Sequence, residues 1–503
     1  MREAVRSADL TFLNMDRPTN LMVVNGLFWF DEKPNWDAVA AVVAARLVAR
    51  YPLLSRRPVN VNGTWMWEDD PGFDLARHLH QIVLRPTDDA GADLAAAQTY
   101  IAERITQPLP RDRPLWELDL VSGLSGHDGG PVALALGRFH HGMADGIRLV
   151  QLMLSLCDVG EDVEATPPTV GRGPASAGLT GRTVGLGKQL IGDAVDFGGG
   201  VISASVRSLL RMPSQIAQLR PDDVPGVLER TIGYVISPTH LTDAITGVAS
   251  QDNQLVNSVR SAGRLALAGH SPDVLGEPKP GVAKRVAWVS GIDLADVKAI
   301  GRRHDATVND VLIAAVARGL TQYVREKGLE PVEAVNWLVP VSLKPVDGNL
   351  PTELGNHFAM VMFPMPLGSA GHDVSLTEIT SRMTRTKNSA EAMMVYGLQK
   401  AIAETPQAVS VGLTDFVANK TVGVLTNVPG PQTPLYLAGT RVSGVLGWVP
   451  TASDQWLGVC IFSYDGTVSI GITSDAGLMP DPGRLAELIK EQFDTLAAEA
   501  AIA

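Results

Sequence analysis

Short apolar runs and stretches of helical apolar spacing alternate along the chain. Residues 21–30 (LMVVNGLFWF) and 130–139 (GPVALALGRF) have the length and composition of buried strands. Between them, apolar residues at helical spacing follow Asn35, a residue type that favours the N-cap position. From Gly146, the segment IRLVQLMLSLCD is apolar almost all round and predicts a buried helix.

The second half of the chain starts again with a strand over 285–290, followed by two helices. Thr307 and Asp310 resemble a capping box, which places Asn309 in the first turn of a helix. Four apolar runs (AVNWLVPVSL, FAMVMFPMPL, TVGVLTNVPG and TVSIGITSD) predict strands, and DPGRLAELIKEQFDTLAAEAA predicts a closing amphipathic helix. Since both halves mix strands and helices, the pattern predicts two related α/β lobes.

The region between the halves has a different character. Residues 160–182 are rich in Pro, Gly, Ser and Thr and predict a linker or crossover. Residues 201–220 contain three arginines and no acid. With Arg207 and Arg211 opposite an apolar face, this segment is either a helix packed on its own domain or a helix at a membrane surface. We therefore expect an N-terminal lobe (1–160), a linker or crossover region with amphipathic helices (161–280) and a C-terminal lobe (281–503).

Composition and charge narrow the class of protein. A chain of 503 residues, 45% of them hydrophobic, exceeds one ordinary core and predicts two domains. The net charge of −12 argues against a general nucleic-acid binder, although a local basic mouth would suffice for an anionic cofactor. Cys157 and Cys460 do not suggest a disulfide framework, which favours a reducing, cytoplasmic compartment. We expect no signal peptide and no membrane-spanning helix.

The candidate chemistry lies in GRFHHGMADGIRL, at the join of a predicted strand and a predicted helix. His140 and His141 have three interpretations. In the first, the pair only makes hydrogen bonds within the join. In the second, His141 and Asp145, which are four residues apart, bind zinc. In the third, a neutral imidazole acts as a general base. Two glycines weaken a helix through this segment and no third ligand is evident nearby, which counts against the metal.

The segment HHGMADG matches the HHxxxDG motif of the CoA-dependent acyltransferase superfamily, which contains chloramphenicol acetyltransferase and the condensation domains of peptide synthetases. With SYDGTVSIGITSD and the stretches below, the chain resembles the bacterial wax ester synthase/diacylglycerol acyltransferase family from roughly residue 8 to 495, least over the 160–280 insert. These stretches occur in the order RPLWELDLV (113–121), VNDVL (308–312), VPVSLKP (339–345), LGNHF (354–358) and TNVPGP (426–431).

The resemblance implies an α/β (α+β) fold of two chloramphenicol-acetyltransferase-like lobes, with the active site in a channel between them. It implies transfer of a long-chain acyl group from acyl-CoA to diacylglycerol, giving triacylglycerol, or to a fatty alcohol, giving a wax ester. Acyl-CoA is then a substrate, and we expect no cofactor, metal or nucleic-acid partner. The enzyme would be cytoplasmic, with peripheral contact to the inner membrane or lipid droplets. A polyketide-type acyltransferase with a carrier-protein donor and a non-catalytic lipid-binding protein remain alternatives.

By the same resemblance, His141 is the general base that deprotonates the acceptor alcohol, and His140 supports the geometry of the site. Asp145 points away from the substrate and pairs with an arginine, so its role is structural. In YPLLSRRPV, Arg57 stands at the place that matches this arginine, although the match is incomplete and Arg56 is the alternative. A bidentate Arg57–Asp145 pair would fix the loop that carries His141.

The remaining site residues also come from the resemblance. Gly146 permits close packing where the helix begins. Asn309 lies near the reacting centre, where an amide in a first helical turn can stabilise negative charge; its alternative is helix capping alone. The PLW motif is thought to line the acyl channel, and the alternative is core packing by Trp116. This motif consists of Pro114, Leu115 and Trp116.

Overall fold

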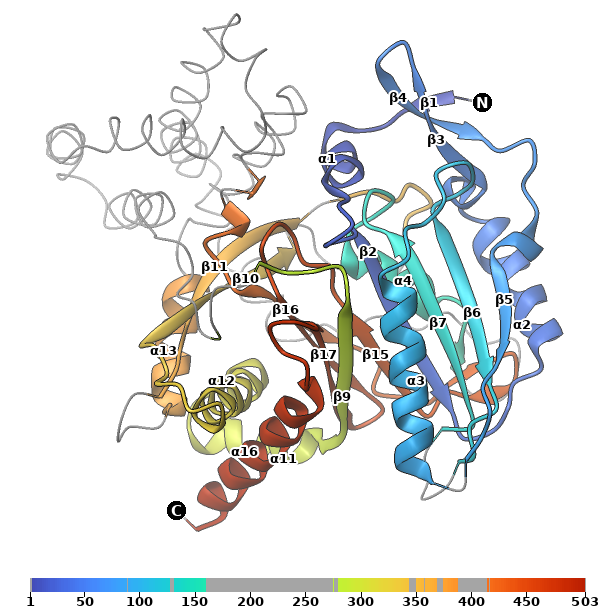
Figure 1. Cartoon of the computed structure of the whole chain (residues 1–503). Helices are drawn as coiled ribbons and strands as arrows, with labels where there is room; N and C mark the ends of the chain where they lie inside the picture. The colour runs from blue at the N-terminus through green and yellow to red at the C-terminus, as the bar shows by residue number, and fades with distance from the viewer. Residues whose placement is uncertain are drawn as a thin grey trace, which may run out of the picture.

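The computed structural model places two α/β lobes side by side, as predicted (Figure 1). The predicted linker at 160–182 and the arginine-rich segment at 201–220 lie outside the described residues, as does almost all of the expected middle region. The structure describes residues 2–87, 89–126, 131–159, 275, 279–342, 350–356, 358–368, 374–387, 414–415 and 417–502.

The first lobe is built on a five-stranded sheet with the order β15–β2–β7–β6–β5. Its central strands, β2 (Val23–Phe30) and β7 (Ala133–His140), are the two apolar runs predicted for this half, and they pair antiparallel. Strands β6 (Trp116–Ser122) and β5 (Leu79–Val83) extend the sheet on one side. The histidine pair therefore begins where β7 ends, beside the start of β2.

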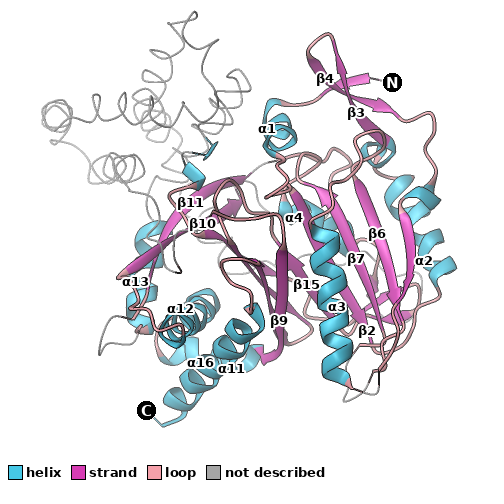
Figure 2. Cartoon of the chain, in the orientation of Figure 1, coloured by secondary structure: helices cyan, strands magenta, loops and turns pink. Residues whose placement is uncertain are grey.

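Helices pack on both faces of this sheet (Figure 2). α2 (Trp36–Val43) and α4 (Gly146–Leu154) share one apolar cluster with the sheet, and α3 (Ala90–Ile105) belongs to another. Asn35 caps α2 as predicted, because its side-chain oxygen accepts from two backbone N–H groups of the first turn, at 3.0 and 3.1 Å.

Smaller elements flank the first sheet. α1 (Ser7–Met15) lies beside the start of β2, and two three-stranded sheets have the orders β1–β4–β3 and β14–β13–β8. Their strands are β1 (Arg2–Ala4), β3 (Arg56–Val61), β4 (Thr64–Asp69), β8 (Asp158–Val159), β13 (Leu435–Leu437) and β14 (Thr440–Arg441).

The second lobe contains a six-stranded sheet with the order β11–β10–β12–β16–β17–β9. The predicted strands and the closing helix of this half are confirmed, and β16 is an additional strand. The strands are β9 (Lys284–Asp293), β10 (Ala334–Ser342), β11 (Phe358–Pro366), β12 (Gly423–Pro429), β16 (Leu457–Tyr464) and β17 (Thr467–Asp475). The helices are α11 (Leu294–Arg303), α12 (Val308–Glu326), α13 (Leu376–Lys387) and α16 (Pro482–Ile502).

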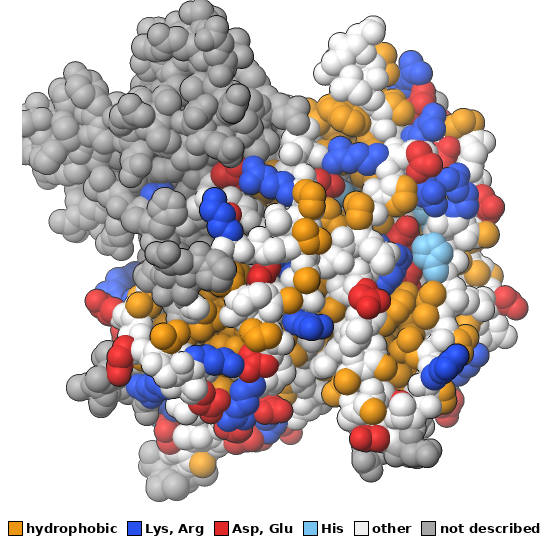
Figure 3. Space-filling model, viewed as in Figure 1, with side chains coloured by type: hydrophobic (Ala, Val, Ile, Leu, Met, Phe, Trp, Pro, Cys, Tyr) orange, Lys and Arg blue, Asp and Glu red, His pale blue; other side chains and the backbone are white. Residues whose placement is uncertain are grey.

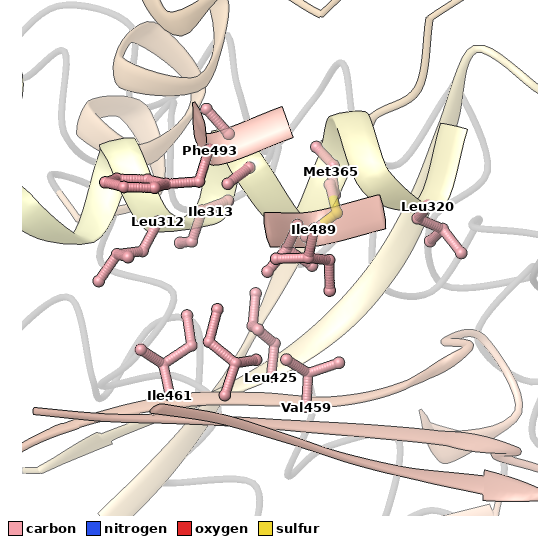
Figure 4. Packing of buried hydrophobic residues seen from close by; sticks show 14 of the residues in the cluster. Leu312, Ile313, Leu320, Met365, Leu425, Val459, Ile461, Ile489 and Phe493 are labelled. Carbon is pink, nitrogen blue, oxygen red and sulfur yellow. The ribbon is translucent and has the colours of Figure 1, made fainter. Parts of the chain in front are cut away.

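α12 and α16 cover the second sheet and supply many of the apolar side chains of its core. α12 begins with the predicted capping box: Thr307 Oγ1 accepts from the N–H of Asp310 at 3.2 Å, and the Asp310 carboxylate accepts from the N–H of Thr307 at 2.9 Å. Figure 4 shows how apolar side chains of both helices meet those of the strands. The labelled side chains are Leu312, Ile313, Leu320, Met365, Leu425, Val459, Ile461, Ile489 and Phe493.

The predicted boundary at residue 281 is wrong for part of the C-terminal half. β15 (Gly444–Trp448) leaves the second lobe and pairs antiparallel with β2, and β13 pairs with β8. Strands pair through backbone hydrogen bonds, which do not depend on side-chain identity. The apolar pattern of a strand therefore does not indicate which sheet it joins. Next to this crossover, Leu27 and Leu134 of the first lobe share a cluster with Val286 of β9. The lobes are thus joined by a strand and by apolar packing.

The close approach of α12 to α16 generates the first prediction. A Cβ built on Gly319 would lie 2.7 Å from Ile489 Cγ1 and 3.0 Å from its Cα. We expect Gly319→Ala to destabilise the protein by about 1–3 kcal/mol through overpacking, despite the better helix propensity of Ala. Gly483→Ala is the matched control, since a Cβ there meets no described atom, and it should be neutral or slightly stabilising. Equal melting temperatures for the two variants would contradict the packing.

Candidate active site

The HHxxxDG segment is a turn that joins β7 to α4. His140 is the last residue of β7, and Asp145 is the N-cap of α4, accepting from the N–H of Arg148 at 3.0 Å. The N–H of His141 donates to the carbonyl of Met22 at 2.7 Å, which ties the turn to the segment before β2. The predicted strand–helix join is confirmed, and its backbone is fixed on both sides.

His140 is held in one orientation by both ring nitrogens. Nδ1 accepts from the N–H of Gly142 at 2.9 Å, so Nε2 carries the proton and donates to Asp16 Oδ2 at 3.0 Å. Burial alone would raise the pKa of Asp16, but hydrogen bonds from His140, the Met22 backbone and Arg111 outweigh it and lower that pKa. With both nitrogens engaged and 1% of the residue exposed, His140 supports the turn and is not available as a base.

His141 lies in an apolar setting of opposite character. Its ring stacks on Phe12 at 4.1 Å between centroids and lies 5.3 Å from Phe358. Burial lowers the pKa of His141 to about 4, so the imidazole is neutral at pH 7. Its Nδ1 is buried and has no hydrogen-bond partner among the described residues. A neutral, uncommitted imidazole is what a general base requires.

Asn356, from the second half of the chain, connects this turn to α1. Its Nδ2 donates to the carbonyl of His141 and to Asp9 Oδ1, both at 2.9 Å, and its backbone N–H donates to the same Asp9 oxygen at 3.1 Å. Burial raises the pKa of Asp9 to about 6, and the bonds from Asn356 and the nearby Arg6 partly offset this. The site therefore includes residues from both halves.

Further bonds run along the same segment. Arg6 donates to the carbonyl of Leu354 at 2.8 Å, and Arg148 donates to the carbonyl of Glu353 at 3.0 Å. The N–H of Asp145 approaches the carbonyl of Gly355 at 3.3 Å. Residues 353–356 thus lie across α1 and the start of α4, which places Phe358 beside His141.

The predicted Arg57–Asp145 ion pair is wrong. Arg57 lies on β3 opposite Glu68 of β4, and its Nη2 is 3.3 Å from Glu68 Oε2. The alternative, Arg56, pairs with Asp69 at 2.9 Å. The register of the β3–β4 hairpin decides both partners, because it fixes which side chains face each other across the strands. For Asp145, the neighbouring cation is Arg148, at 3.8 Å.

The close packing expected at Gly146 is not seen among the described residues. A Cβ at Gly146 would meet no atom within 4 Å in the described part of the chain. The close approach occurs instead at Gly142, where a Cβ would lie 2.9 Å from Leu13 Cγ and 3.0 Å from His140 Nδ1. Gly142 lets the turn pass over α1 and reach the ring of His140.

The PLW motif lies in the core of the first lobe, which supports the packing interpretation. Trp116 is fully buried, donates from Nε1 to the carbonyl of Leu54 at 2.8 Å, and stacks on His78. Pro114 and Leu115 are buried as well. The carbonyl of Leu115 accepts from the N–H of His140 at 3.0 Å, so the motif supports the site from behind.

Asn309 lies in the first turn of α12, as predicted. Its Oδ1 accepts from Asn427 Nδ2 of β12 at 3.0 Å, which anchors it to the second sheet. Its place near the reacting centre stays a prediction.

The described residues also bear on the metal alternative. Across the described ranges, His, Cys, Asp and Glu side chains do not gather in the groups of three or more that a metal site needs.

On the face in Figure 3, acidic and basic side chains are interspersed over both lobes. Among the helices that the structure describes, none is long and apolar enough to cross a bilayer.

A small polar cavity lies between the lobes, near the start of β2. About 40 Å³ of it is open to water-sized molecules, and its walls come from the 18–23 segment, the end of α3, β9, β15 and β17. Three of the lining residues, Asn25, Trp448 and Thr473, each keep a buried side-chain polar atom without a partner among the described residues. Since buried polar atoms are normally satisfied, three unsatisfied atoms on residues that line one cavity are unusual.

Sequence reasoning missed the residues that orient the two histidines. Asp16, Asp9 and Phe12 lie in or next to α1, far from the motif in sequence, and no local pattern indicates their contacts. Asn356 carried a weak signal, because it belongs to the LGNHF stretch. That stretch supported the family resemblance but gave no role to the amide.

Comparisons with known proteins agree with this geometry. The profile of the wax ester synthase/diacylglycerol acyltransferase catalytic domain matches residues 5–312, and that of the WS/DGAT C-terminal domain matches residues 354–497. A probable diacylglycerol O-acyltransferase of Mycobacterium tuberculosis (strain ATCC 25618 / H37Rv) is 27% identical over 475 residues, covering 92% of this chain and 89% of that protein. A putative diacylglycerol O-acyltransferase of Mycobacterium bovis is 26% identical over 512 residues, covering 97% and 90%.

Solved structures share the fold over the whole chain. The wax ester synthase/diacylglycerol acyltransferase of Marinobacter aquaeolei VT8 superposes with a TM-score of 0.61 at 18% identity, covering 99% of both chains. The first condensation domain of the CDA synthetase superposes with a TM-score of 0.51 at 14% identity, covering 100% of this chain and 96% of that one. The predicted fold of two acyltransferase lobes is confirmed.

The capping role of Asp145 generates the second prediction. Asp145→Ala should lower the free energy of unfolding by about 1 kcal/mol, because the N–H of Arg148 loses its acceptor. Asp145→Asn keeps an acceptor oxygen and should retain most of that stability. Denaturant unfolding of both variants tests this, and an Asn variant as unstable as the Ala variant would show that charge, and not capping, is what matters.

Proposed function

The chain belongs to the wax ester synthase/diacylglycerol acyltransferase family and is an acyltransferase, and from this premise we propose that it transfers a long-chain acyl group from acyl-CoA to diacylglycerol. The products are triacylglycerol and free CoA. The observation that carries the proposal is the imidazole of His141, which burial keeps neutral and which stacks on Phe12 within the HHxxxDG turn. A fatty alcohol would react by the same route and give a wax ester.

In the proposed reaction, His141 acts as general base through Nε2. The acceptor hydroxyl gives its proton to Nε2 while its oxygen attacks the thioester carbonyl. The C–S bond then breaks, and the leaving thiolate takes the proton back from the imidazolium. A thioester is already activated, so orientation and a base supply the catalysis without a covalent acyl-enzyme. Negative charge on the reacting oxygen would stabilise the imidazolium that burial disfavours.

The polar cavity between the lobes is our proposed site for the arm of CoA. The pantetheine part of this arm carries amide groups, each with one N–H donor and one carbonyl acceptor. Asn25 Oδ1 offers an acceptor, Trp448 Nε1 a donor, and Thr473 Oγ1 either, and all three lack partners among the described residues. Such a ligand would satisfy the groups that are now buried without a hydrogen bond.

We also propose roles for the other residues of the site. His140, held by Asp16, and Asp145, as the cap of α4, keep the turn in place. We propose that Asn309 contributes its amide at the reacting centre from the second lobe, as the resemblance implies. Because diacylglycerol resides in membranes, we also propose a peripheral contact with a membrane or lipid-droplet surface.

The third prediction tests the base. His141→Gln should lower kcat by about 100-fold or more, the usual contribution of a general base, in an assay of CoA release that depends on added diacylglycerol. Since the pKa of His141 is lowered to about 4, the imidazole stays unprotonated through pH 5–8. The parent's rate should therefore lack an acid limb centred near 6.5, the value of an unperturbed histidine. Near-parent turnover by the variant would overturn the base assignment.

The fourth prediction tests the donor site. Thr473→Val removes one hydroxyl from the cavity and should raise the KM for acyl-CoA about fivefold to tenfold, the effect of one hydrogen bond, while the KM for diacylglycerol stays unchanged. Thr467→Val, at the opposite end of the same strand, is the matched control. Steady-state kinetics with each substrate varied would decide. A change confined to the diacylglycerol KM would assign the cavity to the acceptor instead.

A further inference from the structure

We propose that Asn356 is the positioning residue of His141: its amide oxygen accepts the Nδ1 proton of the ring and leaves Nε2 free to act as the base. This inference rests on the proposed role of His141 as general base. Asn356 comes from the second half of the chain, just before β11, so the base would be oriented from the opposite lobe.

The proposal rests on two buried polar atoms that lack hydrogen-bond partners in the described part of the structure and belong to residues in contact with each other. Asn356 Nδ2 lies 2.9 Å from the carbonyl oxygen of His141. On the same two residues, Asn356 Oδ1 and His141 Nδ1 are buried without a hydrogen-bond partner among the described residues. One is an acceptor and the other is a donor in one tautomer of histidine, so each is the partner that the other lacks.

The orientation of the amide is fixed by its other contacts. Asp9 Oδ1 and the carbonyl of His141 both lie 2.9 Å from one end of the Asn356 side chain. A carbonyl oxygen can only accept, and so can an ionised carboxylate. The end of the amide that faces them must therefore be the NH₂ group, which turns Oδ1 away from Asp9 and leaves it for another donor.

Aromatic packing alone does not select the ring orientation that catalysis needs. Phe12 and Phe358 hold the plane of the His141 ring, at 4.1 and 5.3 Å between centroids. A ring held by its two faces can still flip by about 180° around its Cβ–Cγ bond. The flip keeps the same plane but exchanges the positions of ring nitrogens and carbons. A hydrogen bond at Nδ1 removes this freedom and selects the tautomer with an unprotonated Nε2.

A neutral amide suits this site better than a carboxylate. The turn already lies close to acidic groups, since Asp145 adds to the burial that raises the pKa of Asp9 to about 6. A carboxylate at this position would add another buried negative charge beside them. An amide orients the ring without a buried charge, the part that asparagine plays in cysteine–histidine–asparagine sites. Asp9 in turn holds the amide, which extends the chain of contacts to α1.

The backbone carbonyl of His141 is the competing acceptor for its own Nδ1, and the test separates the two. The parent, Asn356→Ala, Asp9→Asn and Arg318→Met would be labelled with ¹⁵N-histidine, and the tautomer of His141 would be read from its ring nitrogen shifts. Signals are assigned with His141→Gln. Activity would be measured in parallel as kcat and KM with acyl-CoA and diacylglycerol.

We expect the parent to hold His141 as the Nδ1–H tautomer and Asn356→Ala to show a mixture of both. The same variant should lose about 100-fold in kcat, the scale of a misplaced catalytic group, with KM within about twofold. Asp9→Asn keeps an acceptor for the amide and should retain most of the activity. Arg318→Met removes a bond to the carbonyl of Val374, in the second lobe and outside the site, and should lower the melting temperature while kcat and the tautomer stay unchanged.

Two outcomes would overturn the inference. One is an Nε2–H tautomer in the parent, which needs no variant to fold. The other is an unchanged tautomer in Asn356→Ala, which would assign the ring to its own carbonyl. The NMR measurement needs no turnover, so it tests Asn356 even if the acyl-transfer reaction proves to be a different one. Conversely, an inactive His141→Gln with an unchanged tautomer in Asn356→Ala would keep the base and reject its positioning residue.

Discussion

The hydrogen bonds between residues 353–356 and the first lobe are the constraint on which the site depends. Asn356 bridges Asp9 and the carbonyl of His141, and the neighbouring carbonyls accept from Arg6 and Arg148. Three of these four bonds are partly buried, where an unsatisfied polar group is costly, and this favours docking of the second lobe in one register. Correct docking also brings Phe358 against the His141 ring. The surroundings of the His141 imidazole are therefore set by interlobe geometry as much as by the motif itself.

Adjacent residues acquire opposite properties because the chain changes direction between them. His140 ends a strand and meets Asp16, so both of its nitrogens are engaged. His141 begins the turn and meets aromatic faces, so burial lowers its pKa to about 4 and leaves it neutral. The motif needs two histidines since one ring supports the turn that presents the other. A division of roles of this kind is visible only when the strand end is known to within one residue.

The sequence predicted what is encoded locally. Apolar runs located β2, β7 and most strands of the second lobe, and side-chain caps located Asn35 and the Thr307–Asp310 box, because these depend on neighbours in the chain. The motif located the histidine pair. Partners distant in sequence escaped prediction: Arg57 pairs within its hairpin, β15 joins the other sheet, and Asn356 reaches the site through packing. Each of these depends on tertiary register, which a single sequence does not display.

The exchange of β15 between the lobes has a consequence for synthesis on the ribosome. β2 is the edge of the first sheet until residues 444–448 pair with it, and those residues emerge after almost the whole chain. Until then the nascent lobe presents the unpaired N–H and C=O groups of an apolar strand, which is a template for intermolecular pairing. The first sheet therefore cannot be completed before β15 is synthesised. Until then, the edge of β2 has to be protected from pairing with other chains. The strand that closes the sheet also ends this exposure.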